Sequence, residues 1–251
     1  MSSPARPTAL HTELAPAKLT ISLRMTGVRP DGFHLIDAEM VSLDLADTLV
    51  FAEGDALVVV TEATASGALA VHADDDNLVR RALRHVGRTA CVALTKRIPA
   101  GGGLGGGSSD AAAVFRWAGR TTDQDVREAA RLGADVSFCI HGGRARVSGI
   151  GEVCEPLAHR EQTFTLCTPP FGVSTPAVYR AWDALGGPRA DGPNDLEPAA
   201  LVVEPRLALW RDRLREHTGK GPVLAGSGST WFVDGAYPGE GFVVVSTLAR
   251  Q

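Results

Sequence analysis

Apolar and polar residues alternate in the early part of the chain. From residue 19 to residue 26, the apolar side chains of Leu19, Ile21, Leu23 and Met25 stand at every second position. This period of two is typical of a β-strand with one buried face, because successive side chains of a strand point to opposite sides. The residues before it, 1–14, are expected to form a flexible lead-in. Further strand-like runs are expected at 39–45, 48–52, 57–61, 69–72, 92–94, 163–167, 229–233 and 242–246.

Apolar residues at helical spacing appear between these runs. Leu78, Ala82 and Leu83 recur at such a spacing, and Asp76 is expected to cap the helix that they predict. A later break at Gly133 is expected to end another helix and to lead into an apolar segment. Further helices are expected at 109–118, 123–132, 175–185, 196–203 and 205–216.

The order of these elements is mixed rather than a regular alternation of strands and helices. Such an order predicts an α+β fold and argues against a doubly wound parallel sheet. The pattern changes near residue 158, after which a smaller set of strands and helices follows. We therefore expect two domains, at residues 1–158 and 159–251.

The composition is that of a folded globular protein. The chain has 251 residues, of which 44% are hydrophobic and 22% are charged, and this balance excludes a wholly disordered protein. A formal net charge of -4 argues against a broad basic surface for nucleic acid. No apolar run approaches the roughly 20 residues that span a bilayer, and the N-terminal segment lacks the apolar core of a signal peptide. The four cysteines lack C-x-x-C spacing, so we expect buried thiols and a protein of the cytoplasm.

The most informative motif is a glycine-rich segment that precedes a predicted helix. Between Gly101 and Gly107, only Leu104 is not a glycine. Backbone amides without side chains above them can point several N–H groups at phosphate oxygens, and the helix dipole adds to this attraction. Ser108 or Ser109 is expected to cap the helix, with a hydroxyl placed to face a phosphate or its magnesium ion. The segment therefore predicts nucleotide binding.

Two known phosphate-binding loops and a plain linker fit the glycine-rich segment less well. A Walker loop needs a lysine before its Ser or Thr, whereas here Gly107 directly precedes Ser108. Gly101, Gly103 and Gly106 formally satisfy the dinucleotide-binding pattern G-x-G-x-x-G, but no acidic strand end follows at the usual distance. A flexible linker is disfavoured because a helix begins at once. The dinucleotide site remains the formal alternative at this point.

The segment from Pro99 to Ala113 is similar to the P-x-x-x-G-L-G-S-S-A-A loop of the GHMP kinases. Its expanded Gly-Leu-Gly-Gly-Gly-Ser-Ser form resembles one branch of that family, the 4-diphosphocytidyl-2-C-methyl-D-erythritol kinases. The resemblance covers nearly the whole chain, from Pro16 to about Val233. The other segments that resemble the family occur in the family's order, at 16–19, 27–34, 76–78, 96–99, 132–136, 173–175, 178–179, 194–196 and 226–229.

This resemblance implies a fold and a reaction. The implied fold is the two-domain GHMP kinase fold, with an N-terminal domain like domain 2 of ribosomal protein S5 and a ferredoxin-like C-terminal domain. The implied activity is ATP-dependent phosphorylation of the 2-hydroxyl of 4-diphosphocytidyl-2-C-methyl-D-erythritol, in the non-mevalonate route to isoprenoid precursors. ATP and Mg2+ are the implied cofactors, and a small cytidine diphosphate compound is the implied partner. We expect a monomer or a weak homodimer that binds neither nucleic acid nor membrane.

The resemblance also implies roles for single residues. Asp135 and Lys18 are implied as the catalytic pair, in which the carboxylate accepts the proton of the attacking hydroxyl and the ammonium offsets negative charge. The residues implied in ATP binding are Asn77, Lys96, Pro99, Ala100, Gly101, Gly102, Gly103, Leu104, Gly105, Gly106, Gly107, Ser108 and Ser109. The residues implied in substrate binding are Phe33, His34, Thr175, Tyr179, Gly226 and Ser227. The sequence does not identify the magnesium ligands.

Without the resemblance, these residues have ordinary structural roles. Asp135 follows Gly-Ala at the end of a predicted helix, and an aspartate at such a place is typical of a cap or a turn. Lys18 at the start of a strand is typical of a solvated edge residue. Phe33 is equally typical of a turn residue packed on the core. With the resemblance, the alternatives are another GHMP kinase, acting on homoserine, mevalonate or a sugar, and a non-catalytic nucleotide-binding paralogue.

The chain departs from the family pattern at several positions. Thr20 stands where the family usually has Asn, Phe33 where it has Tyr, and Ser137 where it has Pro. Phe33 keeps an aromatic face but lacks the hydroxyl, and Thr20 keeps a hydrogen-bonding group with a different reach. The chain is also shorter than the family pattern. Because Lys18 and Asp135 are both present, we expect an active enzyme.

Overall fold

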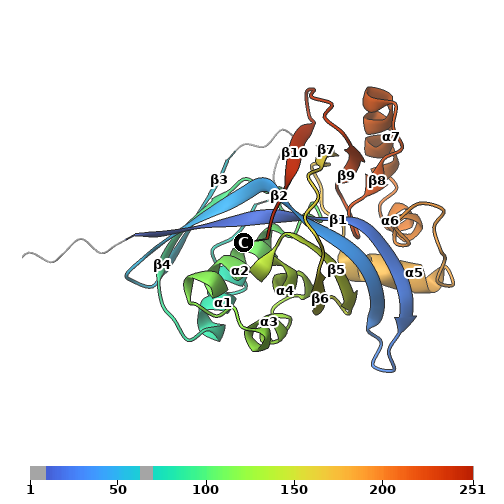
Figure 1. Ribbon diagram of the computed structural model, residues 1–251. Coiled ribbons are helices and arrows are strands. Elements are labelled where there is room, and N and C mark those ends of the chain that lie inside the picture. Colours follow the sequence, from blue (N-terminus) through green and yellow to red (C-terminus); the bar gives the residue numbers. More distant parts are fainter. Residues whose placement is uncertain (1–9, 63–69, 251) are drawn as a thin grey trace, which may run out of the picture.

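Two long antiparallel strands run across the molecule (Figure 1). In the computed structural model, which describes residues 10–62 and 70–250, β1 (His11–Val28) pairs with β2 (His34–Ala52) along most of its length. The register shifts at three places along β1, and bulges of this kind bend a strand. The alternating segment at 19–26 lies within β1, which confirms that strand prediction.

The second edge of β2 is shared by several strands. It pairs antiparallel with β5 (Arg144–Gly149), then with β10 (Val243–Leu248) and then with β4 (Cys91–Lys96). β3 (Ala56–Thr61) lies parallel to β4, and β6 (Val153–Pro156) lies antiparallel to β5. β2 is therefore the central strand of the N-terminal half, with β1 along its other edge.

β10 joins the two halves of the chain. It pairs with two residues of β2 and, further along, with β7 (Thr163–Cys167). β7 also pairs with β9 (Trp231–Asp234), and β9 pairs with β8 (Val223–Leu224). The strands therefore follow the order β3-β4-β2-β10-β7-β9-β8 across both predicted domains. The boundary at residue 158 stays a prediction.

Helices lie on both sides of the long strands (Figure 1). In the N-terminal half they are α1 (Leu78–His85), α2 (Gly106–Trp117), α3 (Asp123–Ala129) and α4 (Ala134–His141). In the C-terminal half they are α5 (Thr175–Ala184), α6 (Glu197–Val203) and α7 (Leu207–Thr218). In Figure 1, α1 to α4 lie below the long strands and α7 lies above them. The α2 helix contacts β1, α1 and α4, and α7 contacts β7 and β9.

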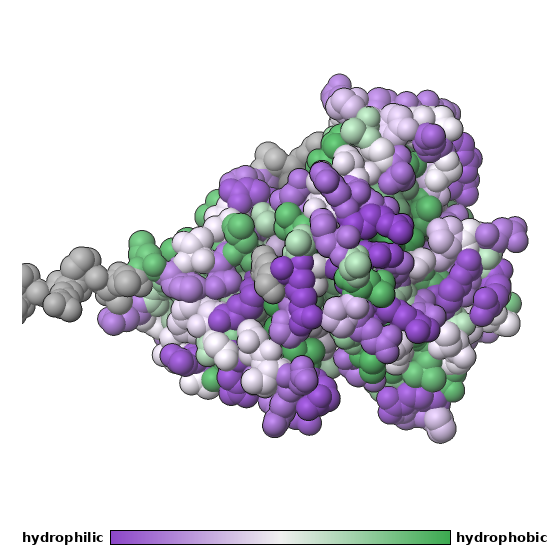
Figure 2. Space-filling view, viewed as in Figure 1, coloured by the Kyte–Doolittle hydropathy of each residue, from purple (hydrophilic) through white to green (hydrophobic). Residues whose placement is uncertain are grey.

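The core of the N-terminal half is centred on α2. Its residues from Ala111 to Phe115 are completely buried. Three of them are alanines, whose small side chains let the helix approach the strands closely. Figure 2 shows mainly polar residues on one face of the molecule, with apolar residues scattered among them. Among residues 10–62 and 70–250, every helix is too short or too polar to cross a bilayer.

The four cysteines only partly match their prediction. Cys139 and Cys167 are buried as expected, whereas Cys91 and Cys154 are only half-buried. All four are free thiols. Burial raises the pKa of Cys154 and of Cys167 to about 11, so that both thiols stay protonated near neutral pH.

Several strand predictions are wrong. The predicted lead-in contains the start of β1, which begins at His11. The predicted strands at 39–45 and 48–52 are parts of one strand, because Ala46 and Asp47 also pair with β1. The segment from Ala70 to His72 has no regular structure, and residue 69 lies outside the described residues. The polar residues between the two apolar runs therefore do not end the strand, because this part of the chain also pairs with β1.

The helix predictions hold in position, and α3 and α5 begin at the predicted residues, but the N-terminal ends of α1 and α2 differ from their predictions. Asn77, not Asp76, caps α1, because its side chain accepts a hydrogen bond from the amide of Val79. The α2 helix begins at Gly106, so that neither predicted serine caps it. Its N-cap residue, Gly105, is in the left-handed conformation with a φ of 67°, which lets the helix start directly after the loop.

The predicted apolar segment after Gly133 is instead a helix. The α4 helix covers 134–141, and its residues Val136 to Ile140 are buried between neighbouring elements. A helix buried nearly all round has no amphipathic period, so that the pattern of the sequence does not reveal it. The short strands β5, β6 and β8 are likewise absent from the sequence-based predictions.

Candidate active site

The glycine loop, residues 99–105, connects the end of β4 to the start of α2. Gly103 and Gly105 have φ values of 77° and 67°, in the region that favours glycine. A Cβ on Gly103 would lie 2.5 Å from the carbonyl oxygen of Gly228, and a Cβ on Gly105 would lie 2.6 Å from Cγ of Lys18. Backbone conformation and close packing therefore both require glycine at these two positions.

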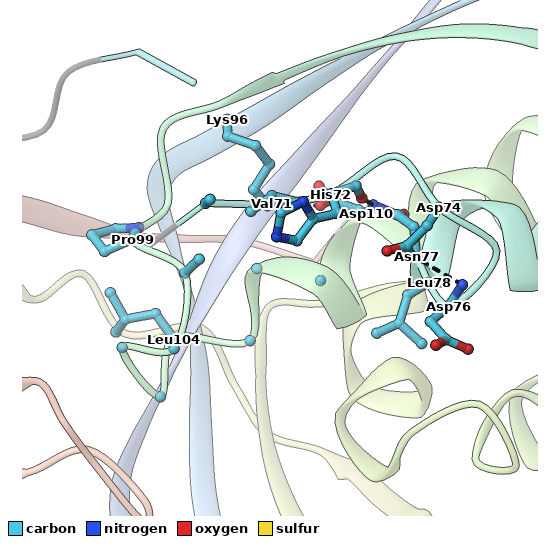
Figure 3. A pocket seen from close by; sticks show the side chains of 18 residues that line it. Val71, His72, Asp74, Asp76, Asn77, Leu78, Lys96, Pro99, Leu104 and Asp110 are labelled. Atoms are coloured by element: carbon cyan, nitrogen blue, oxygen red, sulfur yellow. Dashed lines mark hydrogen bonds and ion pairs between the residues drawn. The ribbon is translucent and has the colours of Figure 1, made fainter. Parts of the chain in front are cut away.

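The first cavity, of about 380 Å³, lies between the glycine loop and the start of α1. Figure 3 shows Pro99 and Leu104 on one side of it and Asn77 and Leu78 on the other. The first turn of α2 also lines it, and the first amides of a helix have no acceptor within the helix. Such free peptide N–H groups at the start of a helix suit an anion. The predicted ATP-binding residues that line it are Asn77, Lys96, Pro99, Ala100, Gly101, Gly102, Gly103, Leu104, Gly105, Gly106 and Gly107.

The two serines that follow the loop lie outside this lining. The hydroxyl of the buried Ser109 donates a hydrogen bond to the carbonyl oxygen of Pro16 at 2.7 Å. Ser108 is half-buried and lines a second cavity on the other side of the loop. Ser109 therefore ties α2 to β1, and a contact of either serine with a phosphate stays a prediction.

Lys96 lines the first cavity and lies between two buried carboxylates. Its Nζ donates to Asp47 of β2 and, at 2.7 Å, to Asp110 of α2. Asp47 also accepts hydrogen bonds from the amides of Arg97 at 2.5 Å and Ile98 at 2.9 Å. This cluster ties together β2, the end of β4 and α2, which are the elements that hold the glycine loop.

Burial and charge shift the pKa values of this cluster. Burial lowers the pKa of Lys96, but the two carboxylates outweigh this effect and raise it above its usual value. Burial raises the pKa of Asp110 to about 7; Lys96 opposes this shift and Asp47 adds to it. One oxygen of Asp110, Oδ1, is buried without a hydrogen-bond partner among the described residues. One ammonium between two carboxylates leaves an excess negative charge, which a proton on Asp110 removes.

The second cavity, of about 600 Å³, adjoins the first at the glycine loop. Gly103 and Gly105 line both cavities. The predicted catalytic and substrate-binding residues that line the second one are Lys18, Phe33, His34, Asp135, Thr175, Tyr179, Gly226 and Ser227. The tertiary structure therefore brings all of them to one place, on the far side of the loop from the first cavity.

The two predicted catalytic residues are in contact. Nζ of Lys18 on β1 lies 3.2 Å from Oδ2 of Asp135, and it donates to Oγ1 of Thr20 at 3.2 Å. Asp135 belongs to the first turn of α4, where the helix dipole stabilises a carboxylate. It thus begins a helix rather than ending one, and Lys18 is buried rather than a solvated edge residue. Both ordinary structural interpretations of these residues are wrong.

A group of rings forms another part of the second cavity. The ring centroids of His34 and Tyr179 are 4.8 Å apart, and Nε2 of His34 is hydrogen-bonded to Oδ1 of Asp183 at 2.7 Å. Burial raises the pKa of Tyr179 to about 12, so that its phenol stays neutral. Phe33 is 55% exposed, with the guanidinium carbon of Arg29 5.9 Å from its ring centroid. Phe33 is therefore available to a ligand rather than packed in the core.

Known proteins resemble this chain in sequence and in structure. The GHMP kinases N terminal domain matches residues 77–153. A 4-diphosphocytidyl-2-C-methyl-D-erythritol kinase of Paracoccus denitrificans is 38% identical over 239 residues, which cover 88% of this chain and 85% of its own. One from Cereibacter sphaeroides is 36% identical, with 87% of each chain covered. The chain belongs to the 4-diphosphocytidyl-2-C-methyl-D-erythritol kinase family.

Solved structures agree with this family membership. A crystal structure of 4-(cytidine 5'-diphospho)-2C-methyl-D-erythritol kinase has a TM-score of 0.70 and 29% identity, and covers 94% of this chain and 99% of its own. The L. major mevalonate kinase in complex with R-mevalonate has a TM-score of 0.60 at 14% identity, which shows a shared fold alone. The protein is thus an enzyme, a kinase with the two-domain α+β fold of the GHMP kinases. The dinucleotide-binding alternative for the glycine loop is wrong.

In this family member, the 225–228 turn between β8 and β9 completes the second cavity. The hydroxyls of Ser227 and Thr175 are 2.8 Å apart and hydrogen-bonded. A Cβ on Gly226 would lie 3.8 Å from Nζ of Lys18, so that the turn borders this lysine directly. The turn also meets the glycine loop, since the carbonyl oxygen of Gly228 is the atom closest to a Cβ on Gly103.

The sequence analysis of this kinase missed several residues of the site. Asp47 and Asp110 hold Lys96, and Asp183 holds His34. A signal existed for Asp110, because it is a charged residue just before a run of alanines in a predicted helix. No local signal marks Asp47 or Asp183, since polar residues on strands and helices are usually solvated.

Proposed function

We propose that this kinase transfers the terminal phosphate of ATP to the 2-hydroxyl of 4-diphosphocytidyl-2-C-methyl-D-erythritol, giving the 2-phosphate and ADP. The observation that carries the proposal is the Lys18–Asp135 ion pair at 3.2 Å, beside a loop that lines two adjoining cavities. One cavity has the peptide N–H groups that suit phosphates, and the other has the rings that suit a nucleobase. This arrangement fits a donor and an acceptor that meet at the glycine loop.

Each member of the ion pair has a role in phosphoryl transfer. The oxygen of the 2-hydroxyl attacks the terminal phosphorus of ATP, and the bond from that phosphorus to the bridging oxygen of ADP breaks. Asp135 accepts the hydroxyl proton. Lys18 holds the carboxylate in place and offsets the negative charge of the transferred group. Phosphoryl transfer relies mainly on position and charge, so that one base and one fixed cation suffice beside the loop.

The glycine loop and the first turn of α2 would hold the phosphates of ATP, with Asn77 beside the nucleoside. Lys96 would act mainly through the loop that it supports, because its ammonium is already paired with Asp47 and Asp110. Its placement in the cavity lining supports the predicted ATP-binding role, and its pairing favours structural support of the loop as the form of that role.

Mg2+ would lie where the two cavities adjoin at the glycine loop. Among residues 10–62 and 70–250, no three His, Cys, Asp or Glu side chains lie close enough to hold a metal by themselves. Mg2+ commonly takes one or two protein oxygens together with waters and substrate phosphates. The hydroxyl of Ser108, which lies near the start of α4, would be such a ligand alongside the nucleotide. When bound, the ion would neutralise phosphate charge.

The cytidine end of the acceptor would occupy the part of the second cavity lined by rings. Phe33 and Tyr179 supply aromatic faces, and His34 supplies a ring nitrogen for the edge of the base. Thr175 and Ser227 also line this cavity, with their hydroxyls in contact. The monomeric or weakly dimeric state, the lack of nucleic-acid and membrane partners, and the cytoplasmic location stay predictions.

The direct test is a turnover assay. Purified protein is incubated with ATP, Mg2+ and 4-diphosphocytidyl-2-C-methyl-D-erythritol, and ADP release is measured. We expect ADP to form in proportion to added acceptor, with CMP as a competitor. ADP release only with mevalonate or homoserine would assign another GHMP kinase activity, and ATP binding without turnover on any acceptor would indicate a non-catalytic paralogue.

A further inference from the structure

Asn194 holds the 225–228 turn with both hydrogens of its side-chain amide. Nδ2 donates to the carbonyl oxygen of Leu224 at 2.8 Å and to that of Gly226 at 2.6 Å. Oδ1 accepts from the amide of Leu196 at 2.9 Å. The side chain is 1% exposed, so that water does not compete for these bonds.

The backbone around Asn194 is docked on the strand that carries the catalytic lysine. The amide of Leu23 donates to the carbonyl oxygen of Pro193 at 2.8 Å, and the amide of Asp195 donates to that of Leu23 at 2.9 Å. These bonds form a short parallel bridge with β1. Asn194 therefore connects β1, which carries Lys18, to the turn that borders Lys18 from the other side.

The turn has little freedom to move without disturbing the site. Gly226 borders the ammonium of Lys18, and Gly228 packs against Gly103 of the glycine loop. The amide of Thr230, just beyond the turn, donates to the carbonyl oxygen of Gly102 at 3.1 Å. A displacement of the turn is thus transmitted both to the catalytic ammonium and to the loop.

We propose that Asn194 is a positioning residue for phosphoryl transfer, which sets the 225–228 turn against Lys18 and the glycine loop. The inference rests on the proposed function, because it assigns the turn to the reacting end of the cavity. Asn194 does not line either cavity, so that its effect acts through the turn rather than through contact with a ligand. Misplacement of reacting groups by about 1 Å can cost roughly 100-fold in rate.

Asn194→Asp is the most informative variant. A carboxylate has nearly the shape of the amide and can still accept from the Leu196 amide, but it cannot donate to two carbonyl oxygens. Buried and facing these oxygens, the new carboxyl would titrate well above the ordinary pKa of about 4. When protonated, it regains one O–H donor. The rate of Asn194→Asp relative to wild type should therefore rise as the pH falls.

The charged groups near this position do not reproduce that pH dependence. On β1, Arg24 pairs with Asp195 at 2.7 Å, and Lys18 pairs with Asp135. The segment from Val223 to Phe232 contains no titratable side chain. On α6, burial raises the pKa of Glu197. All of these groups are present in wild type and in both variants, so that the ratio of rates isolates position 194.

The experiment measures kcat and both KM values for wild type, Asn194→Asp and Asn194→Ala between pH 6 and pH 8.5. We expect Asn194→Asp to lose about 10- to 100-fold in kcat at the upper pH, with smaller changes in KM, and to recover towards pH 6. Asn194→Ala lacks the titrating group, and its loss should stay constant with pH. Asp125→Asn, which alters the capping box of α3, is the stability control, and we expect a lower Tm with unchanged kcat.

The outcomes separate the two proposals. If wild type does not turn over the cytidine substrate, the proposed function fails, whatever the variants do. If wild type is active and both variants keep its kcat, the positioning role of Asn194 is overturned. The same holds if Asn194→Asp and Asn194→Ala lose equal activity at every pH, since that result indicates general destabilisation. If Asn194→Asp fails to fold, a folded Asn194→Ala with wild-type kcat still refutes the proposal.

Discussion

Lys18 and Asp135 form an ion pair whose two partners differ in their access to solvent. The side chain of Lys18 is 7% exposed, whereas that of Asp135 is 30% exposed. The stem of the lysine is enclosed by Gly105 of the glycine loop, and the carboxylate opens towards the second cavity. The pair therefore combines a buried cation with a carboxylate that is open to the cavity, which is the arrangement that the proposed reaction requires.

Asp135→Asn should nearly abolish turnover. The amide keeps the shape of the side chain but cannot accept the hydroxyl proton, so that kcat should fall by about 100- to 10,000-fold. The affinity for ATP should change little, because in the proposed function the glycine loop, not Asp135, holds the phosphates. ADP release gives kcat, and calorimetry with a non-hydrolysable ATP analogue gives the dissociation constant. Retention of the full rate would refute the role of Asp135 as the base.

Gly103→Ala should disrupt the site more than a similar change elsewhere. Its Cβ would meet the carbonyl oxygens of Gly228 at 2.5 Å and Ala225 at 2.9 Å, so that the loop and the turn must separate. Gly119→Ala is the matched control, because Gly119 also has a positive φ, of 70°, but has open space around a Cβ. Both variants should lose about 1–2 kcal/mol of stability from the left-handed backbone.

Only Gly103→Ala should also lose activity. We expect its kcat/KM for ATP to fall by at least about tenfold, because the loop amides leave their positions around the phosphates. Gly119→Ala should keep the wild-type value. Equal activity of the two variants would show that the contact between the loop and the turn is unimportant for catalysis.

Asp183→Asn should weaken binding of the cytidine substrate. The carboxylate of Asp183 accepts the Nε2 hydrogen of His34, which leaves Nδ1 as an acceptor for the base. An amide at position 183 can instead donate to Nε2 and so favour the opposite tautomer. We expect KM for the cytidine substrate to rise about tenfold, the cost of one hydrogen bond of about 1.4 kcal/mol. The KM for ATP should stay constant.

Asp212→Asn is the control for this change. Asp212 is an exposed carboxylate on α7 that pairs with Arg211 and Arg215, and surface pairs of this kind contribute little to stability. Its KM values should equal those of wild type. An unchanged substrate KM in Asp183→Asn would mean that Asp183 does not set the state of His34.

Asp110→Asn should change how stability depends on pH. The pKa of Asp110 is raised from 3.8 to about 7 in the folded protein, mainly by burial. Between these values the folded protein holds a proton that the unfolded chain releases, so that this group lowers the free energy of unfolding as the pH rises. An asparagine cannot ionise, so that in the variant position 110 does not lower the free energy of unfolding as the pH rises.

The free energy of unfolding of Asp110→Asn, relative to that of wild type, should therefore increase from about pH 4 to about pH 7 and level off above it. Urea unfolding at a series of pH values measures this difference. If the free energy of unfolding depends on pH in the same way in the two proteins, Asp110 does not titrate in this range. The pair of Lys96 with Asp47 remains in the variant, which favours correct folding.

Local features of the chain were predicted well because they depend on neighbouring residues. Alternation of apolar residues located the middle of β1, and helical spacing located α1 and the C-terminal helices. The glycine loop was recognisable because few regular structures tolerate such a density of glycine. Errors arose where distant pairing decided the outcome, as in β2, which continues through Asp47 because β1 pairs with it.

The sequence by itself therefore predicted phosphate binding at residues 101–107 and, through family motifs, which other residues belong to the site. Only the tertiary structure decided which of them meet. Lys18 reaches Asp135 because the strand and the helix pack on α2, and Asn194 reaches Gly226 because its segment docks on β1. The physical reason is that such contacts depend on strand register and on packing between distant elements. Neither is encoded within a short window of the chain.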